Sequence, residues 1–183
     1  MIYLRRNMFL GEIADIVFSF PDKGVKEVVD WVYPAFLDEN NVIADIKTES
    51  EMATNPLCKI KVGDIIIKRI QPQFVNYVAE DLNAYIGQNL VIVRSRKEIV
   101  PKYLAYIMER DLNKLYKDTA GAILTAINRK CFDEFDVGEL PPLDKQRAIG
   151  ELWWLNKERK KLYKKLLEKE NQQLEYKLRI LTK

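Results

Sequence analysis

The chain has 183 residues, of which 48% are hydrophobic, with 30 Lys and Arg against 27 Asp and Glu. This apolar content suffices for a folded core, and the seven Gly and seven Pro argue against a disordered protein. No apolar run approaches the roughly 20 residues that a membrane-spanning helix needs, and the N-terminus lacks a signal-peptide pattern. We therefore expect a cytoplasmic protein that does not enter a membrane.

The sequence contains no histidine. This excludes a histidine general base, a Ser–His–Asp triad and a histidine metal ligand. The two cysteines, Cys58 and Cys131, cannot form a four-cysteine zinc site, and they suit reduced core residues. No glycine-rich phosphate loop is present. The sequence therefore predicts a binding protein with no catalytic residue, no metal site and no cofactor.

Charge and proline divide the chain near residue 140. Residues 1–143 carry 18 basic and 21 acidic side chains, whereas residues 144–183 carry 12 basic and 6 acidic ones. Pro141 and Pro142 mark the same boundary, because each lacks the amide hydrogen that a helix or a sheet requires. We predict a domain over residues 1–139 and a separate helical element over residues 140–183.

In chain order, the first part predicts a mixed α+β domain. β-branched and aromatic residues indicate strands at 12–20, 28–33, 41–46, 58–62, 65–70, 74–78 and 90–93. Gly63 and Asp64 form a turn between two of these strands. Residues 101–116 have apolar positions at helical spacing, and Pro101 suits the first turn of a helix.

The second part predicts one long helix. Residues 144–182 contain no Pro and are rich in Leu, Lys, Glu, Gln and Arg, all strong helix formers. Asp144 is a suitable N-cap. A helix of this length would extend about 58 Å at 1.5 Å per residue. Gly150 is compatible either with a kink or with a continuous helix.

Apolar residues recur along this helix at heptad spacing, in a stripe wider than a two-stranded coiled coil needs. A second frame adds Trp153, Tyr163, Leu167, Leu174 and Leu181. The helix could fold back on its own domain, but the domain is too small to cover the whole stripe. We favour pairing with a second helix from another chain. The predicted interface residues are Leu152, Leu155, Leu162, Leu166, Tyr176 and Ile180.

Three segments carry a resemblance to a known family. Residues 62–67 (VGDIII) resemble a strand signature, and residues 101–106 (PKYLAY) resemble a helix start. Residues 140–149 (LPPLDKQRAI) resemble the step that opens a long helix. In this order, they resemble one half of a DNA-specificity subunit of type I restriction-modification systems, over nearly the whole chain.

The resemblance implies a target-recognition domain followed by a long helix that forms a coiled coil. It implies double-stranded DNA, the methyltransferase (modification) subunit and the restriction subunit as partners. The methyltransferase subunit would bring S-adenosylmethionine and methylate adenine. Full-length subunits of this family have two domains and two helices, whereas this chain has one of each. We therefore expect a homodimer through the C-terminal helix that reads a bipartite target.

One local departure from the family concerns the first loop. Residues 19–24 (SFPDKG) stand where the family has a glycine followed by Thr-Pro. The geometry of this loop is therefore not implied by the resemblance. The loop around Lys23 and Lys26 is a third candidate DNA contact, after the two segments described next.

The first candidate DNA-contact segment follows the strand at 65–70. Arginine can form two hydrogen bonds with guanine, and glutamine and asparagine can do so with adenine. An exposed turn between strands is the alternative interpretation for each residue. The candidates are Lys68, Arg69, Gln71, Gln73 and Asn76.

The second candidate segment spans residues 117–130. It resembles the polar loop that faces DNA in the family, before the last strand of the domain. The alternative is a helix C-terminus with Lys117 beside the helix dipole. The candidates are Thr119, Thr125, Asn128, Arg129 and Lys130.

Two other functions stay open from the residues alone. An acidic domain joined to a long helix also suits a coiled-coil adaptor that binds another protein. Asp22, Asp45 and Lys47 follow the order of a Mg²⁺-dependent PD-(D/E)xK nuclease, although exposed strand-end residues explain them equally. A basic helix face could contact phosphate or simply be solvated. It consists of Lys160, Lys161, Lys164 and Lys165.

Overall fold

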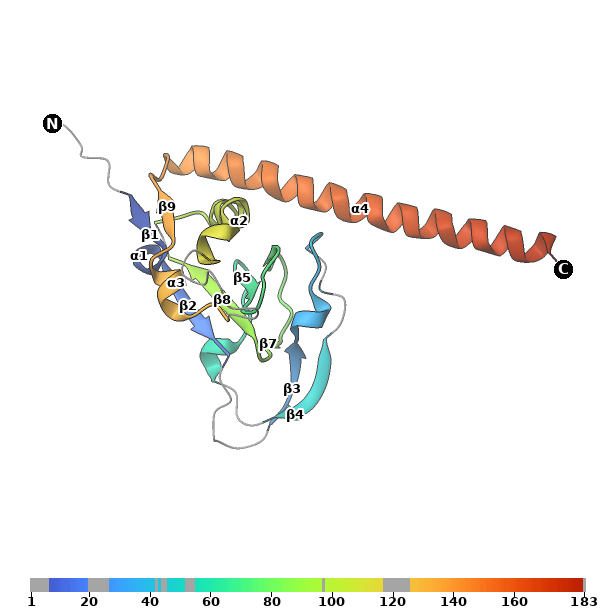
Figure 1. Cartoon of the computed structure of the whole chain (residues 1–183), viewed down its shortest axis with the longest axis horizontal. Coiled ribbons are helices and arrows are strands. Elements are labelled where there is room, and N and C mark those ends of the chain that lie inside the picture. Colours follow the sequence, from blue (N-terminus) through green and yellow to red (C-terminus); the bar gives the residue numbers. More distant parts are fainter. Residues whose placement is uncertain are drawn as a thin grey trace.

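The computed structural model describes residues 7–19, 27–41, 43, 46–51, 55–96, 98–116 and 126–182. Its centre is a four-stranded antiparallel sheet in the order β2-β8-β5-β6, with a long C-terminal helix, α4, above it (Figure 1). The strands of this sheet are β2 (Ala14–Phe18), β8 (Leu90–Ser95), β5 (Ile65–Lys68) and β6 (Val75–Tyr77). The mixed α+β architecture predicted from the sequence is confirmed.

Two smaller sheets flank the central one. The first pairs β4 (Lys47–Glu51) antiparallel and β7 (Tyr85–Ile86) parallel with β3 (Glu27–Val32). The second pairs β1 (Met8–Phe9) with β9 (Asp136–Gly138), so it joins the two ends of the domain. The short helices are α1 (Leu10–Ile13), α2 (Pro101–Arg110) and α3 (Arg129–Asp133), with 3-10 turns at Pro34–Phe36, Pro56–Cys58 and Leu112–Tyr116.

Both faces of the central sheet are buried. Successive side chains of a strand point to opposite faces, so Ile65 and Ile67 join one core while Ile66 joins the other. The first core lies under α2, and the second lies against Val32 and Ile86 of the neighbouring sheet. A continuous apolar run rather than an alternating one is what a strand covered on both sides requires.

Two strand predictions were wrong. Cys58 ends a 3-10 turn that Asn55 caps by accepting a hydrogen bond from Leu57 N at 2.9 Å, Lys59 forms only an isolated antiparallel bridge to Tyr85, and a turn begins at Val62. Residues 41–46 form no strand in their described part. Asn41 instead buries its amide, and Asn41 Nδ2 donates to Tyr77 O at 2.9 Å. The strand begins at Lys47.

The helix α4 (Leu143–Leu181) is continuous through Gly150. Its N-cap is Pro142 rather than the predicted Asp144, which lies in the first turn and pairs with Arg147 at 2.7 Å. Gln146 fixes the start of the helix, since its Oε1 accepts a hydrogen bond from Val100 N at 3.0 Å and its Nε2 donates to Pro141 O at 2.8 Å.

The first half of α4 packs along α2. Lys157 is buried against the domain, where Nζ forms an ion pair with Glu109 and donates to Glu39 O at 2.8 Å. Trp153 Nε1 donates to the other oxygen of Glu109 at 2.7 Å. The rings of Trp153 and Trp154 pack on Tyr77, and burial raises the pKa of the Tyr77 hydroxyl. Helix and domain therefore form one packed unit.

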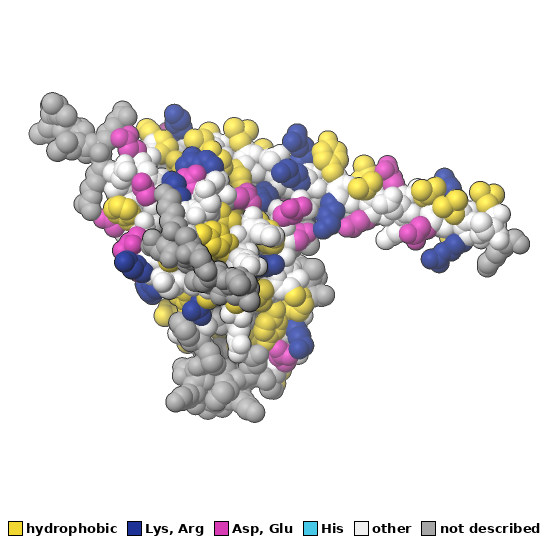
Figure 2. Space-filling model, viewed as in Figure 1, with side chains coloured by type: hydrophobic (Ala, Val, Ile, Leu, Met, Phe, Trp, Pro, Cys, Tyr) yellow, Lys and Arg dark blue, Asp and Glu magenta, His cyan; other side chains and the backbone are white. Residues whose placement is uncertain are grey.

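The second half of α4 projects beyond the domain. Every residue from 162 to 182 is exposed, and Lys164 pairs with Asp38 at 2.8 Å near the point where the helix leaves the domain. Figure 2 shows hydrophobic side chains along this projecting part. Among the described residues, no helix is long and apolar enough to span a bilayer. In the first turns the domain covers Ile149, Trp153, Trp154 and Lys157, whereas the predicted interface residues from Leu152 onward stay exposed.

Replacing Gly150 with alanine should weaken the packing of α4 on α2. A Cβ at this position would lie 2.8 Å from Tyr103 N and 2.9 Å from Lys102 Cβ. Alanine favours a helix by about 1 kcal/mol over glycine, but overpacking costs roughly 1–3 kcal/mol, so we expect a lower free energy of unfolding. Urea denaturation followed by tryptophan fluorescence measures it. Asn171→Ala on the projecting half is the control, and a Gly150→Ala variant at least as stable as wild type would contradict this packing.

Candidate nucleic-acid interface

One edge of the central sheet collects the predicted DNA-contact residues. The strands β2 and β5 both pair antiparallel with β8, so they run in the same direction and end at the same edge. Phe18 ends β2 and Lys68 ends β5 there. The helix α4 packs on Tyr77, which pairs with Ile65 at the opposite end of β5. The edge is therefore directed away from the docked helix. We call its described residues 69–74 and 126–130 the loop edge.

The two segments predicted separately meet at the loop edge. Ile127 N donates to Arg69 O at 2.9 Å, and Arg69 Nε donates to Ile127 O at 3.3 Å. An antiparallel bridge joins Ile70 to Ala126. Because these bonds link backbone to backbone and side chain to backbone, the two segments form a single surface.

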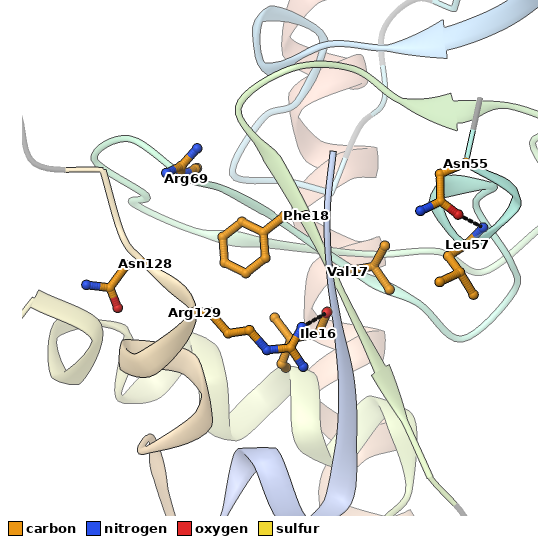
Figure 3. A pocket seen from close by; sticks show the side chains of 8 residues that line it. All are labelled: Ile16, Val17, Phe18, Asn55, Leu57, Arg69, Asn128 and Arg129. Atoms are coloured by element: carbon orange, nitrogen blue, oxygen red, sulfur yellow. Dashed lines mark hydrogen bonds between the residues drawn. The ribbon is translucent and has the colours of Figure 1, made fainter. Parts of the chain in front are cut away.

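A hollow of about 320 Å³ opens beside these bonds (Figure 3). Apolar side chains of β2 and the turn before Cys58 line it, and Arg69, Asn128 and Arg129 form its polar side. The Arg69 guanidinium lies 5.6 Å from the centre of the Phe18 ring, and Arg129 Nη1 donates to Ile16 O at 3.2 Å. Both arginines thus contact residues of β2, and both remain at least partly exposed to solvent.

Four basic residues surround the hollow or continue its rim. Arg129 pairs with Asp133 at 3.4 Å and Lys130 with Glu134 at 3.7 Å, and both cations are mostly exposed. Exposed pairs of this kind contribute about 0–1 kcal/mol, so a phosphate can compete for these side chains. No described carboxylate pairs with Lys68 or Arg69, and the Lys68 ammonium lies 4.9 Å from the centre of the Phe74 ring.

The loop after β5 presents both glutamines to solvent. Gln71 and Gln73 are exposed, whereas Pro72 between them is buried and accepts a hydrogen bond from the Tyr116 hydroxyl at 2.5 Å. Gln71 has a backbone φ of 45°, in the left-handed region that residues other than glycine seldom adopt. This backbone turn and the anchored proline together hold the loop in one shape.

Asn128 has a structural role within the loop edge. It is the N-cap of α3, and its Oδ1 accepts a hydrogen bond from Cys131 N at 3.1 Å. Asn128 is exposed, so its amide nitrogen can reach a ligand. Because this cap fixes the first turn of α3, it also fixes the positions of the Arg129 and Lys130 side chains.

The remaining predicted residues have other positions. Asn76 is fully buried in β6, and its Nδ2 donates to Asp38 O at 3.0 Å, so the prediction of a DNA contact does not hold for it in this conformation. Thr119 and Thr125 lie outside the described residues, as do Lys23 and Lys26.

Sequence reasoning missed the apolar side of the hollow. Phe18 was predicted only as part of a strand, and neither Leu57 nor the polar Asn55 beside it was singled out. The dipeptide Asn55-Pro56 is a turn signal that could have placed a loop beside the strand end. Apolar side chains gave no signal of their own, because a strand end next to a core has the same composition.

The nuclease pattern has no support in the described residues. Asp22 and Asp45 lie outside them, and Lys47 pairs with Glu49 in β4, where its hydrogen bond lowers the pKa of the Glu49 carboxyl. Within the described part of the chain, no group of three or more Cys, Asp or Glu side chains could hold a metal ion.

Comparison with known proteins gives a result at the level of the fold. No protein-family model matches the sequence, and no curated protein matches it. Among solved structures, the HsdS subunit from Thermoanaerobacter tengcongensis matches with a TM-score of 0.65 and 19% identity, over 92% of this chain and 46% of that one.

Two further structures agree. A chain from a study of complex assembly and conformational transition of the type I R-M system matches with a TM-score of 0.67 and 16% identity, over 91% of this chain and 46% of that one. The type I restriction-modification S subunit from M. genitalium matches with a TM-score of 0.56 and 16% identity, over 90% and 42%. This chain spans slightly less than half the length of each. It therefore has the fold of one half of a type I restriction-modification S subunit.

Proposed function

We propose that this chain acts as one half of a DNA-specificity subunit. Its domain reads a short sequence in double-stranded DNA with the loop edge, and its helix α4 joins it to a second copy. The observation that carries the proposal is the convergence of residues 69–74 and 126–130 on one basic edge, in a fold shared with S subunits. The chain performs no chemistry itself.

The chemistry of the loop edge suits both kinds of DNA contact. Arg69 and Arg129 can each donate two hydrogen bonds to guanine, and Gln71 and Gln73 can bond adenine through their amides. Lys68 and Lys130 supply positive charge for phosphates, which fix the position of the protein on the duplex. Thr119 and Thr125 remain part of the proposed contact set.

A second copy would complete the subunit. Leu152, Leu155, Leu162, Leu166, Tyr176 and Ile180 are each more than half exposed in the single chain. A long exposed row of apolar side chains usually marks a protein interface. In a two-fold symmetric pair with antiparallel helices, each stripe covers the other. Two identical domains would then read an interrupted palindrome.

The partners of such a subunit would be the subunits that act on DNA. We propose that the dimer directs an adenine methyltransferase subunit, and a restriction subunit, to the target. S-adenosylmethionine would belong to the methyltransferase and not to this chain. A gel shift on DNA fragments, with and without a methyltransferase partner, separates this function from that of a coiled-coil protein adaptor, which would shift neither.

Arg69→Ala and Arg129→Ala should each weaken DNA binding while the domain stays folded. The expected loss is about 1–3 kcal/mol of binding free energy where the arginine contacts a base edge, and less where it contacts phosphate. Fluorescence anisotropy with a labelled target duplex measures it. Arg147→Ala, which removes an exposed arginine of α4, is the matched control. Unchanged affinity and sequence preference in both loop-edge variants would remove this edge from the DNA interface.

Replacing Leu162 and Leu166 together with aspartate should prevent dimer formation. Near a symmetric helix crossing, each new carboxylate would face apolar side chains, at a cost on the order of several kcal/mol. Light scattering at micromolar concentration gives the mass. Lys160→Asp with Asn171→Asp, also on α4 but off the stripe, should leave the dimer intact. A wild-type monomer would refute the homodimer and require a different second half.

A further inference from the structure

A groove lies where α4 leaves the domain. It has a volume of about 520 Å³ and lies between one face of α4 and the domain. The helix contributes Trp154, Glu158, Lys161 and Lys165, and the domain wall includes Ile43 and Leu82. The four helix residues follow each other at steps of four, three and four, so they share one face of the helix. We call this face the groove face.

The groove contains a carboxylate oxygen that accepts no hydrogen bond from a described residue. This oxygen, Glu158 Oε1, is shielded from solvent. Lys161 Nζ forms a long ion pair with it at 3.8 Å, beyond hydrogen-bond distance, and 37% of the Glu158 side chain is exposed. A shielded carboxylate oxygen is unfavourable unless a donor reaches it. The groove is therefore suited to a ligand that brings a cation or a hydrogen-bond donor.

The groove face adjoins the apolar stripe. Glu158 lies three residues after Leu155 and four before Leu162, so these side chains are neighbours on the helix surface. A helix that covers the stripe would therefore pass beside the groove. Because the stripe is exposed on the single chain, the second copy's α4 is the natural occupant.

The same face continues along the projecting half of α4. Gln172 and Tyr176 lie 18 residues, or about five helical turns, beyond Trp154 and Glu158. Lys169 lies between the two sets, and all three residues line a shallow exposed hollow. A two-fold axis that passes between two antiparallel helices, perpendicular to both, keeps their groove faces on the same side of the pair.

Symmetry then places one half over the other. If the helices cross near Leu162 and Leu166, residues 169–176 of one copy lie opposite residues 152–159 of the other. The second copy's Lys169 comes next to Glu158, and its Tyr176 comes next to the outer end of the groove. Cation meets carboxylate, twice in the dimer.

We propose that this groove is the docking site for the projecting half of the second copy's α4, with Lys169 of that copy paired to Glu158. This inference rests on the proposed pairing of α4 and adds a contact between each domain unit and the opposite helix. It gives a reason why the apolar and polar surface of α4 needed for assembly is wider than a two-helix seam.

A charge exchange tests the contact on the full chain. Glu158→Lys and Lys169→Glu should each raise the dimer dissociation constant about tenfold, because each puts like charges together. The double variant should return to within about threefold of wild type, since the pair is restored with reversed sign. Sedimentation equilibrium measures all four proteins. Glu175→Lys lies 18 residues beyond Lys157, on the face turned away from the seam, and should change nothing.

The outcomes separate this inference from the function proposed above. A wild-type chain that remains monomeric would overturn the pairing of α4 itself. A wild-type dimer that is indifferent to both single substitutions, or a double variant no better than the single ones, would overturn the groove contact and leave the helix pairing in place.

Discussion

The ion pair between the buried Lys157 and the partly exposed Glu109 fixes how the long helix leaves the domain. Taking two charges out of water offsets much of their attraction, so such a pair adds little net stability, but separating it leaves an unpaired charge and is costly. Lys157 also donates to Glu39 O, and Trp153 donates to Glu109. The close approach of α2 at Gly150 permits this contact. Domain and helix therefore have one favoured orientation.

This orientation places the proposed DNA-binding edge and the proposed dimerisation helix near opposite ends of the central sheet. The loop edge lies at the end of β2 and β5, and α4 packs near the opposite end of the same sheet. Since both faces of this sheet are buried, it serves as a rigid spacer between them. In a pair of chains joined through α4, two loop edges would be held at a set separation, as a bipartite target requires.

The sequence predicted best those elements whose pattern is local. The apolar run of β5, the helical spacing of α2 and the uninterrupted α4 are present, although β5 ends at Lys68 and the predicted helix over 101–116 divides into α2 and a 3-10 turn. The strand prediction for residues 58–62 failed because Cys58 and Ile60 are buried while Lys61 is exposed. This pattern is typical of a strand, but the segment forms only an isolated bridge at Lys59. Contacts between residues far apart in the sequence could not be predicted from it. The amide of Asn76 is buried against Asp38 O, and Lys157 is buried although lysine is usually exposed to solvent. The loop edge was found through its polar residues, but its apolar side was not.

The most direct test of the central claim is selection of bound sequences from a random DNA pool, with the full chain and an adenine methyltransferase partner. Two identical domains held apart by paired helices predict enrichment of an interrupted palindrome, with two equal half-sites and a constant spacer. Enrichment of a single short site, of two unlike half-sites, or of no sequence at all would contradict a homodimer that reads DNA through its loop edges.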